Sequence, residues 1–112
     1  MHAFSNGAWG KLELVRFRNG RAWALMRRLP QGEVECLHLE TGKDSAVVLF
    51  TDEAKAVAHI SNLHDAGWET WLLDGPSELE RFVCEAKKTG VTQVIVNPIV
   101  TADGIKYLRV PI

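Results

Sequence analysis

The sequence predicts an α+β protein: a single-domain mixed β-sheet with two helices that lie mainly on one face. Two patterns carry this prediction. In the first half of the 112-residue chain, short apolar stretches alternate with turn signals. In the second half, apolar strands alternate with amphipathic helical patterns, and the connections are short. The length fits one domain, and the 46% hydrophobic and 24% charged residues are typical of a globular protein.

The first half is expected to form an antiparallel meander. Residues 1–10 are small, polar or glycine-rich, so we expect a poorly ordered leader followed by one domain over residues 11–112. Asn19-Gly20 favours a type I′ hairpin, because both central residues of that turn need positive φ. The expected elements are a strand from Leu12 to Phe17, a return strand over 22–26, a turn at 30–32, a strand over 34–39 and a turn at 41–44.

The second half is expected to alternate strands and helices. Residues 46–50 are apolar at every position, which indicates a central strand or one covered on both faces. Thr51 is expected to cap a helix that starts at Asp52 and ends by Gly67. Its apolar face is predicted at Ala54, Val57, Ala58 and Ile60. The later elements are a strand over 68–73, a helix capped by a Ser77/Glu80 box and closed at Gly90, a strand over 91–96 stopped by Asn97-Pro98, a turn at 102–104 and a strand over 105–110. The apolar stripe of this second helix is predicted at Leu79, Phe82, Val83 and Ala86.

The order strand–helix–strand–helix–strand implies two right-handed crossovers and three parallel strands. Together with the meander it gives a sheet of about seven strands with only two helices. Two helices cannot cover both faces of such a sheet. The uncovered face has to meet solvent, curl on itself or bind a partner, so the element count alone points to association.

Composition narrows the class of protein. The net charge is −1, with basic residues concentrated between 11 and 28 and acidic residues between 52 and 85. The two cysteines, Cys36 and Cys84, sit in apolar stretches and are expected to be reduced thiols. No apolar signal segment follows Met1, and no apolar run approaches the roughly 18 residues of a membrane helix. We therefore expect a cytoplasmic protein with no membrane partner.

No motif predicts catalysis, a metal or a cofactor. The chain has no glycine-rich phosphate loop and no Gly-x-Ser-x-Gly. Cys36 and His38 are the closest metal-ligand pair, and two ligands do not make a site. His59 and His64 are five residues apart, which places them on different helix faces. We therefore predict no catalytic residue, no metal ligand and no cofactor.

Tryptophan is abundant, with four in the chain. Trp68 and Trp71 are three apart on one expected strand, so their side chains should point to opposite faces of the sheet. One of the two should lie on the face without helices, and tryptophan is enriched where a partner buries a surface. Trp23 is expected to pack in the core and is the third interface candidate. The leading hypothesis is therefore a non-enzymatic interaction module, a homo-oligomer or the binder of a protein partner.

Two other hypotheses stay open. A small-molecule binder or enzyme would place its site at the carboxyl ends of the parallel strands, where Thr51, Ser77 and Asn97 would line it. The basic hairpin carrying Arg16, Arg18 and Arg21 could contact nucleic acid. Nucleic-acid binding is the least favoured of the three, because the chain as a whole is slightly acidic.

Two short segments resemble a known family. Phe50-Thr51-Asp52-Glu53-Ala54 closes an apolar strand, and Val96-Asn97-Pro98 ends a later one. This layout resembles the N-terminal domain of SseB-like proteins, although Ile99 stands where that family has glycine. The resemblance implies a strand, a helix and a later strand in this layout, in proteins that are linked to serine sensitivity and to secretion-associated roles and have no established enzymatic activity.

Overall fold

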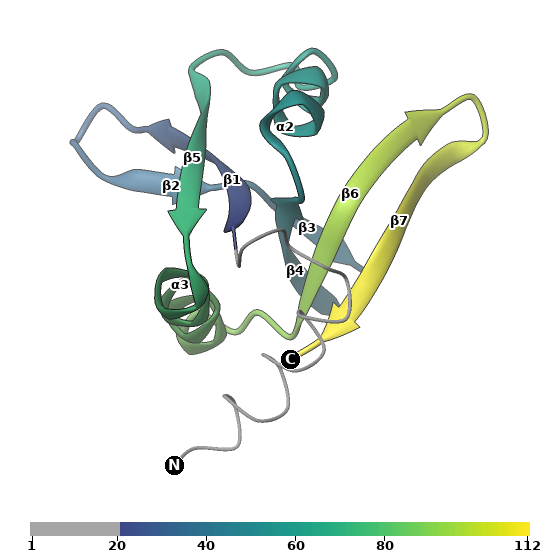
Figure 1. The fold of residues 1–112 in the computed structure, drawn as a ribbon. Coiled ribbons are helices and arrows are strands. Elements are labelled where there is room, and N and C mark those ends of the chain that lie inside the picture. The colour runs from purple at the N-terminus through teal and green to yellow at the C-terminus, as the bar shows by residue number, and fades with distance from the viewer. Residues whose placement is uncertain (1–20) are drawn as a thin grey trace.

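The computed structural model describes residues 21–112, which form a mixed sheet of seven strands with two helices (Figure 1). The α+β class is confirmed. The predicted strand from Leu12 to Phe17 and the Asn19-Gly20 turn lie outside the described residues. The elements are β1 (Arg21–Arg28), β2 (Val34–Cys36), β3 (His38–Thr41), β4 (Asp44–Phe50), α2 (Glu53–Ile60), β5 (Trp68–Asp74), α3 (Pro76–Lys88), β6 (Gln93–Thr101) and β7 (Gly104–Pro111).

The sheet has the order β2-β1-β4-β6-β7, with β5 also paired to β1 and β3 also paired to β4. Within the described residues β4 and β6 are the only parallel neighbours, with Val48 opposite Ile95. The three strands predicted to be parallel, β4, β5 and β6, do run in the same direction, but β5 is not a neighbour of the other two, because β1 lies between β5 and β4. β5 pairs instead with β1, antiparallel along its whole length. The reason is that β1 offers β5 an edge seven residues long, whereas both edges of β4 are already occupied.

The strand predicted over 34–39 is two strands that meet at Leu37. Its N–H donates to the carbonyl of Leu25 in β1 (2.9 Å), and its carbonyl accepts from the N–H of Val48 in β4 (3.3 Å). β1 and β4 pair directly at only two positions and then diverge. Where they separate, β2 pairs with β1 and β3 pairs with β4. The buried Leu37 is thus the point where the chain passes from one diverging strand to the other.

The two helices cover opposite faces of the sheet. Leu79 and Val83 of α3 pack with one set of alternating strand residues, including Leu49. Ala56 of α2 packs with the other set, including Val48. The prediction that both helices lie mainly on one face is therefore wrong. β5 lies on one side of β4, and β6 lies on the other. The connection through α2 therefore crosses the sheet in one direction, and the connection through α3 crosses it in the opposite direction. Two connections of the same hand that run in opposite directions place their helices on opposite faces of the sheet.

The start of α2 differs from the prediction. Asp52, not Thr51, is its N-cap, and the Asp52 carboxylate accepts the Lys55 N–H (2.9 Å). The helix ends at Ile60, well before Gly67. Its buried residues are Ala56 and His59, whereas Val57 is 53% exposed. The predicted buried face of α2 is therefore wrong. Alanines lie on both sides of the helix, so its apolar pattern is weak, and tertiary packing determines which side is buried.

The apolar stripe of α3 is confirmed. Leu79 and Val83 are fully buried, and Phe82 and Ala86 pack beside them. The predicted Ser77/Glu80 cap does not form, because Pro76 occupies the first helical position and Gly75 becomes the N-cap. The Glu78 carboxylate instead accepts the N–H of Asp74 (2.6 Å).

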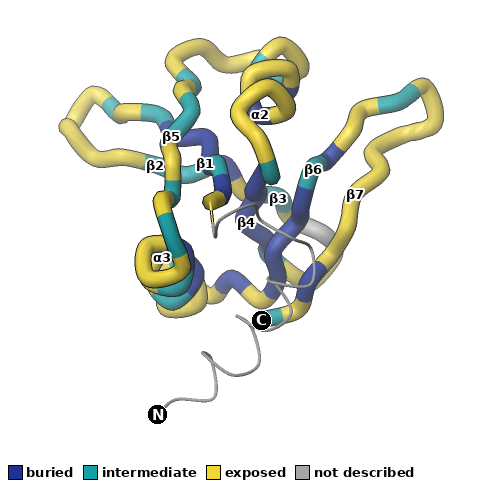
Figure 2. The backbone as a smooth tube through the Cα atoms, in the orientation of Figure 1, coloured by how far each residue is buried: buried dark blue, intermediate teal, exposed yellow. Residues whose placement is uncertain are grey.

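β6 does not stop at Asn97-Pro98, as the sequence suggested, but continues to Thr101. The register with β7 shifts by one residue between Val96 and Ile99, which is a β-bulge. Asn97 has φ of 51°, and Pro98 has no N–H for the ladder. Beyond the bulge the β6–β7 hairpin projects past the rest of the sheet (Figure 1), and most of β7 is exposed (Figure 2). We call residues 97–108 the arm.

We expect Leu37→Ala to lower the free energy of unfolding by about 2–4 kcal/mol, because it leaves a cavity where β1 and β4 separate. Urea unfolding followed by tryptophan fluorescence measures the loss. Leu39→Ala is the matched control, since Leu39 is only partly buried at the rim of the same cluster. Equal losses at both positions would show that Leu37 has no special place in the fold.

Candidate functional site

Thr51 and Asn97 meet where the parallel strands β4 and β6 lie side by side. The side-chain carbonyl of Asn97 accepts the backbone N–H of Thr51 (3.0 Å). Its amide group donates to the Thr51 hydroxyl (2.9 Å). Asparagine also tolerates the left-handed backbone that the bulge requires. This pair, which we call the Thr51–Asn97 clamp, fixes the start of the arm to the segment that leads into α2.

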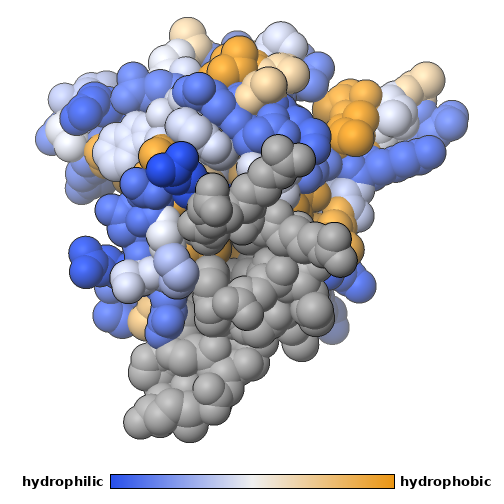
Figure 3. All heavy atoms as spheres, viewed as in Figure 1, coloured by the Kyte–Doolittle hydropathy of each residue, from blue (hydrophilic) through white to orange (hydrophobic). Residues whose placement is uncertain are grey.

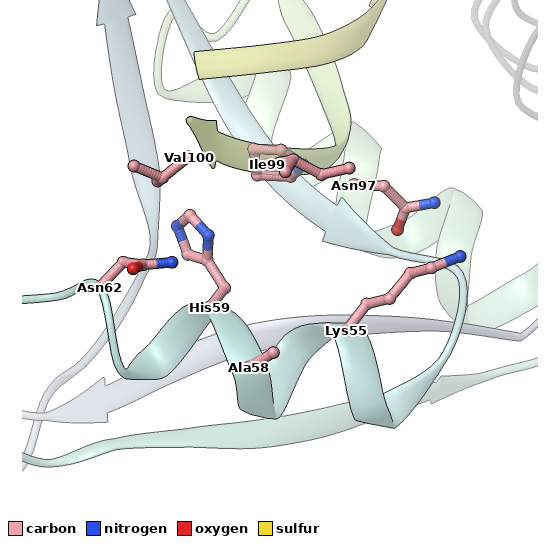
Figure 4. Close-up of a pocket in the computed structure, with 8 residues that line it drawn as sticks. Lys55, Ala58, His59, Asn62, Asn97, Ile99 and Val100 are labelled. Carbon is pink, nitrogen blue, oxygen red and sulfur yellow. The ribbon is translucent and has the colours of Figure 1, made fainter. Parts of the chain in front are cut away.

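A groove opens between α2 and the first residues of the arm (Figure 4). Its volume is about 170 Å³, which is below the usual size of a ligand pocket. Its lining comes from α2 and the adjoining loop (Lys55, Ala58, His59, Asn62) and from the arm (Asn97, Pro98, Ile99, Val100). Lys55 is ion-paired with Asp52 (3.4 Å), and the Asn97 amide is held in the clamp. The groove is therefore small and largely apolar.

His59 is the buried polar group of this groove. His59 is 6% exposed, and the centroid of its ring lies 5.5 Å from the centroid of the Phe50 ring. Its Nδ1 atom is buried without a hydrogen-bond partner in the described part of the chain. Burial lowers the pKa of His59 below its ordinary value, so the ring is neutral at pH 7.

A larger cavity of about 530 Å³ lies between β2, β3 and α3. Apolar side chains such as Val47 and Phe82 form part of it, and three carboxylates, Glu35, Glu40 and Glu85, also line it. Cys36 is the group with nucleophilic potential here. Burial raises the pKa of its thiol to about 12, which keeps it protonated and unreactive at neutral pH.

The predicted pocket residues are only partly brought together. Thr51 and Asn97 are in contact, but Ser77 lies in the first turn of α3 beside a separate depression lined by Arg81 and Cys84. Three other groove residues were not predicted from the sequence: Lys55, His59 and Asn62. Their spacing of four and three residues was the available signal, because it places them on one side of a helical segment.

The three tryptophan candidates pack against the core of their own chain. Trp23 and Trp68 contact the α2-side cluster, and Trp71 contacts the α3-side cluster. The predicted opposite orientation of Trp68 and Trp71 is confirmed. The guanidinium of Arg27 lies 4.7 Å from the Trp68 ring and also pairs with Glu35 and Asp65. The three half-buried rings thus contact residues of their own chain.

Of the arginines proposed for nucleic acid, Arg16 and Arg18 lie outside the described residues. Arg21 at the start of β1 is ion-paired with Asp74 at the end of β5 (2.9 Å). Both side chains are more than half exposed, and an exposed pair of this kind adds little stability. Arg21 thus has an intramolecular partner.

Exposed apolar side chains gather on the arm. Across residues 21–112 eight large hydrophobic residues are exposed, and five of them lie on the arm: Ile99, Val100, Ile105, Tyr107 and Leu108. Ile99 is the most exposed of all, at 60%. Figure 3 shows hydrophobic atoms over the upper part of the β6–β7 hairpin. Most of the large apolar side chains that are exposed in the described part of the chain therefore lie on the arm.

No known family model matches this chain, and no curated protein sequence does either. The resemblance to SseB-like N-terminal domains stays a prediction. Among residues 21–112, no three histidine, cysteine, aspartate or glutamate side chains gather closely enough to hold a metal ion. In the same part of the chain, neither helix has the length and apolar character to cross a bilayer.

We expect Asn97→Gly to lower the free energy of unfolding by about 1–2 kcal/mol, because both clamp hydrogen bonds are lost. Asn97→Ala should cost about 1 kcal/mol more, since alanine also resists positive φ. Chemical denaturation measures both. Asn62→Ala is the control, as it changes an exposed amide in the same groove. A loss at Asn62 as large as at Asn97 would contradict a structural clamp.

The His59 environment predicts a pH dependence. The folded pKa is lowered from 6.5, so the contribution to stability is complete above about pH 6.5 and is lost as pH falls through the folded pKa. His59→Phe removes this titration. We therefore expect the unfolding free energy of the variant to fall less between pH 7.5 and 5.5 than that of the wild type. His64→Phe is the control at an exposed position, and identical pH profiles for all three proteins would refute the assignment.

Proposed function

We propose that this protein is an interaction module that associates with itself through the arm. The observation that carries the proposal is the concentration of exposed apolar side chains on residues 97–108. Exposed apolar side chains that gather on one part of a molecule are typical of a binding surface, because their exposure to water is unfavourable. The arm also projects from the sheet, which makes it accessible to a second molecule (Figure 1).

The proposed interface lies on the arm, whereas the sequence suggested a face of the sheet without helices. A helix covers part of each face at the centre of the sheet, and the tryptophans pack against these covered regions. Among residues 21–112, neither helix covers the end of the sheet at β6 and β7 beyond the bulge. Burial also keeps the Cys36 thiol protonated, which disfavours nucleophilic catalysis at the larger cavity.

A second candidate function is small-molecule binding in the groove between α2 and the arm. The observation in its favour is His59, whose buried Nδ1 has no partner among the described residues. A small uncharged ligand would suit the apolar lining and neutral ring. Native mass spectrometry of the purified protein tests this candidate, since a retained small molecule that is lost in Ala58→Trp would support it. A spectrum without adducts would count against it.

Sedimentation velocity over a range of concentrations tests the leading proposal. We expect the wild-type chain to form dimers or larger species with a dissociation constant on the order of micromolar, because the arm is small beside standard interfaces. Ile105→Ser combined with Leu108→Ser should shift the protein to monomer by removing exposed apolar contacts.

Val34→Ser is the matched control, since Val34 is an exposed apolar residue on β2, away from the arm. It should leave association unchanged. A wild-type chain that stays monomeric at all concentrations would overturn the proposal, as would equal effects of the arm and control variants.

A further inference from the structure

We propose that the partner of the arm is β7 of a second copy, which pairs antiparallel with β7 about a two-fold axis through Tyr107. The inference rests on the proposed function and specifies its geometry. β7 ends the sheet, with β6 on one side and no strand on its other edge among residues 21–112. It is eight residues long, and only Val110 is buried. A long exposed edge strand is a template for pairing with another strand.

The hydrogen-bond phase of β7 identifies the groups on its open edge. The N–H of Ile112 donates to the carbonyl of Thr92 across the β6–β7 ladder (3.0 Å). Inward and outward backbone groups alternate along an antiparallel strand. Even-numbered residues of β7 therefore bond to β6, and Ile105, Tyr107 and Arg109 direct their N–H and C=O outward. Pro111 falls in the outward phase, where its missing N–H leaves the β6 ladder intact.

One two-fold register satisfies this phase over most of the strand. With Tyr107 opposite Tyr107 of the partner subunit, residues 104–110 of each copy pair within β7. Tyr107 then exchanges two backbone hydrogen bonds across the axis. An axis at Ile105 keeps the phase, but it pairs only three residues of β7 before the turn at 102–103. The Tyr107 register thus gives the longest ladder.

Charge favours the same register. It places Lys106 opposite the partner's Leu108 and Arg109 opposite the partner's Ile105, so like charges are not directly opposed. An axis at Lys106 would oppose two lysines, and an axis at Arg109 would oppose two arginines. Directly opposed like charges destabilise strand pairing. The two basic residues therefore exclude competing registers while their alkyl stems cover apolar neighbours.

Both apolar faces of the arm continue across this axis. Ile105 and Tyr107 lie on the α2 side of the sheet, since Arg109 shares that face with buried Ile95. Leu108 lies on the α3 side, opposite buried Val96. Pairing of two β7 strands brings each set beside its copy. The exposed side chains and the open backbone edge are thus buried by one partner.

Disulfide trapping in the full chain tests the register. In a background with Cys36→Ala and Cys84→Ala, Tyr107→Cys should oxidise to a covalent dimer, because opposed hydrogen-bonded residues lie about 5.5 Å apart between Cα atoms. Lys106→Cys alone should not crosslink, since its copy is about 7–8 Å away on the diagonal. A mixture of Lys106→Cys and Leu108→Cys chains should crosslink, because these two positions are directly opposed.

Amide hydrogen exchange gives an independent readout in the unmodified chain. The N–H groups of Ile105, Tyr107 and Arg109 should gain protection as concentration rises, whereas the N–H of Lys106 should be protected at every concentration by β6. A dimer without Tyr107→Cys crosslinking and without this alternation would overturn the pairing mode and leave the proposed function standing. A strictly monomeric chain would overturn both. Crosslinking of Lys106→Cys as efficient as that of Tyr107→Cys would indicate random collision and also overturn the register.

Discussion

The divergence of β1 and β4 is the constraint on which the rest of the structure depends. The two strands pair at only two positions, and the backbone of Leu37 then bonds to both as they separate. β2 and β3 fill the gap, so the backbone groups of the diverging strands stay paired. Because this arrangement occupies one edge of β1, β5 takes the other edge, and the two helical connections have to run in opposite directions across the sheet.

The opposite directions of the connections decide where apolar surface remains. α2 covers one face and α3 the other, so the centre of the sheet is closed on both sides. The last hairpin extends beyond this covered centre. The bulge at Asn97-Pro98 and the clamp to Thr51 hold the start of the hairpin against α2, and the apolar residues beyond it stay in solvent. The same clamp therefore borders the small groove and orients the proposed interaction surface.

Two titratable groups of the described chain, Cys36 and His59, are held in uncharged forms by burial. Desolvation raises the pKa of Cys36 and lowers the pKa of His59, and both effects disfavour the charged state. A nucleophilic cysteine would need the reverse shift, because the thiolate is the reactive form. The proposed interaction depends on other features: the edge of β7 that no strand of residues 21–112 occupies, and the apolar side chains on both faces of the arm.

Local pattern in the sequence determined the central strand 46–50, the buried stripe of α3, the turn at 102–104 and the opposite orientation of Trp68 and Trp71. Each depends on the pattern of apolar and turn residues within a short segment, and this pattern indicates which side chains face the core. Tertiary structure alone decided the break at Leu37, the faces of the helices and the continuation of β6. It also decided the contact between Thr51 and Asn97, which are 46 residues apart. Periodicity does not specify which strand is the neighbour, and His59 was missed because a polar residue on a helix is ordinarily exposed.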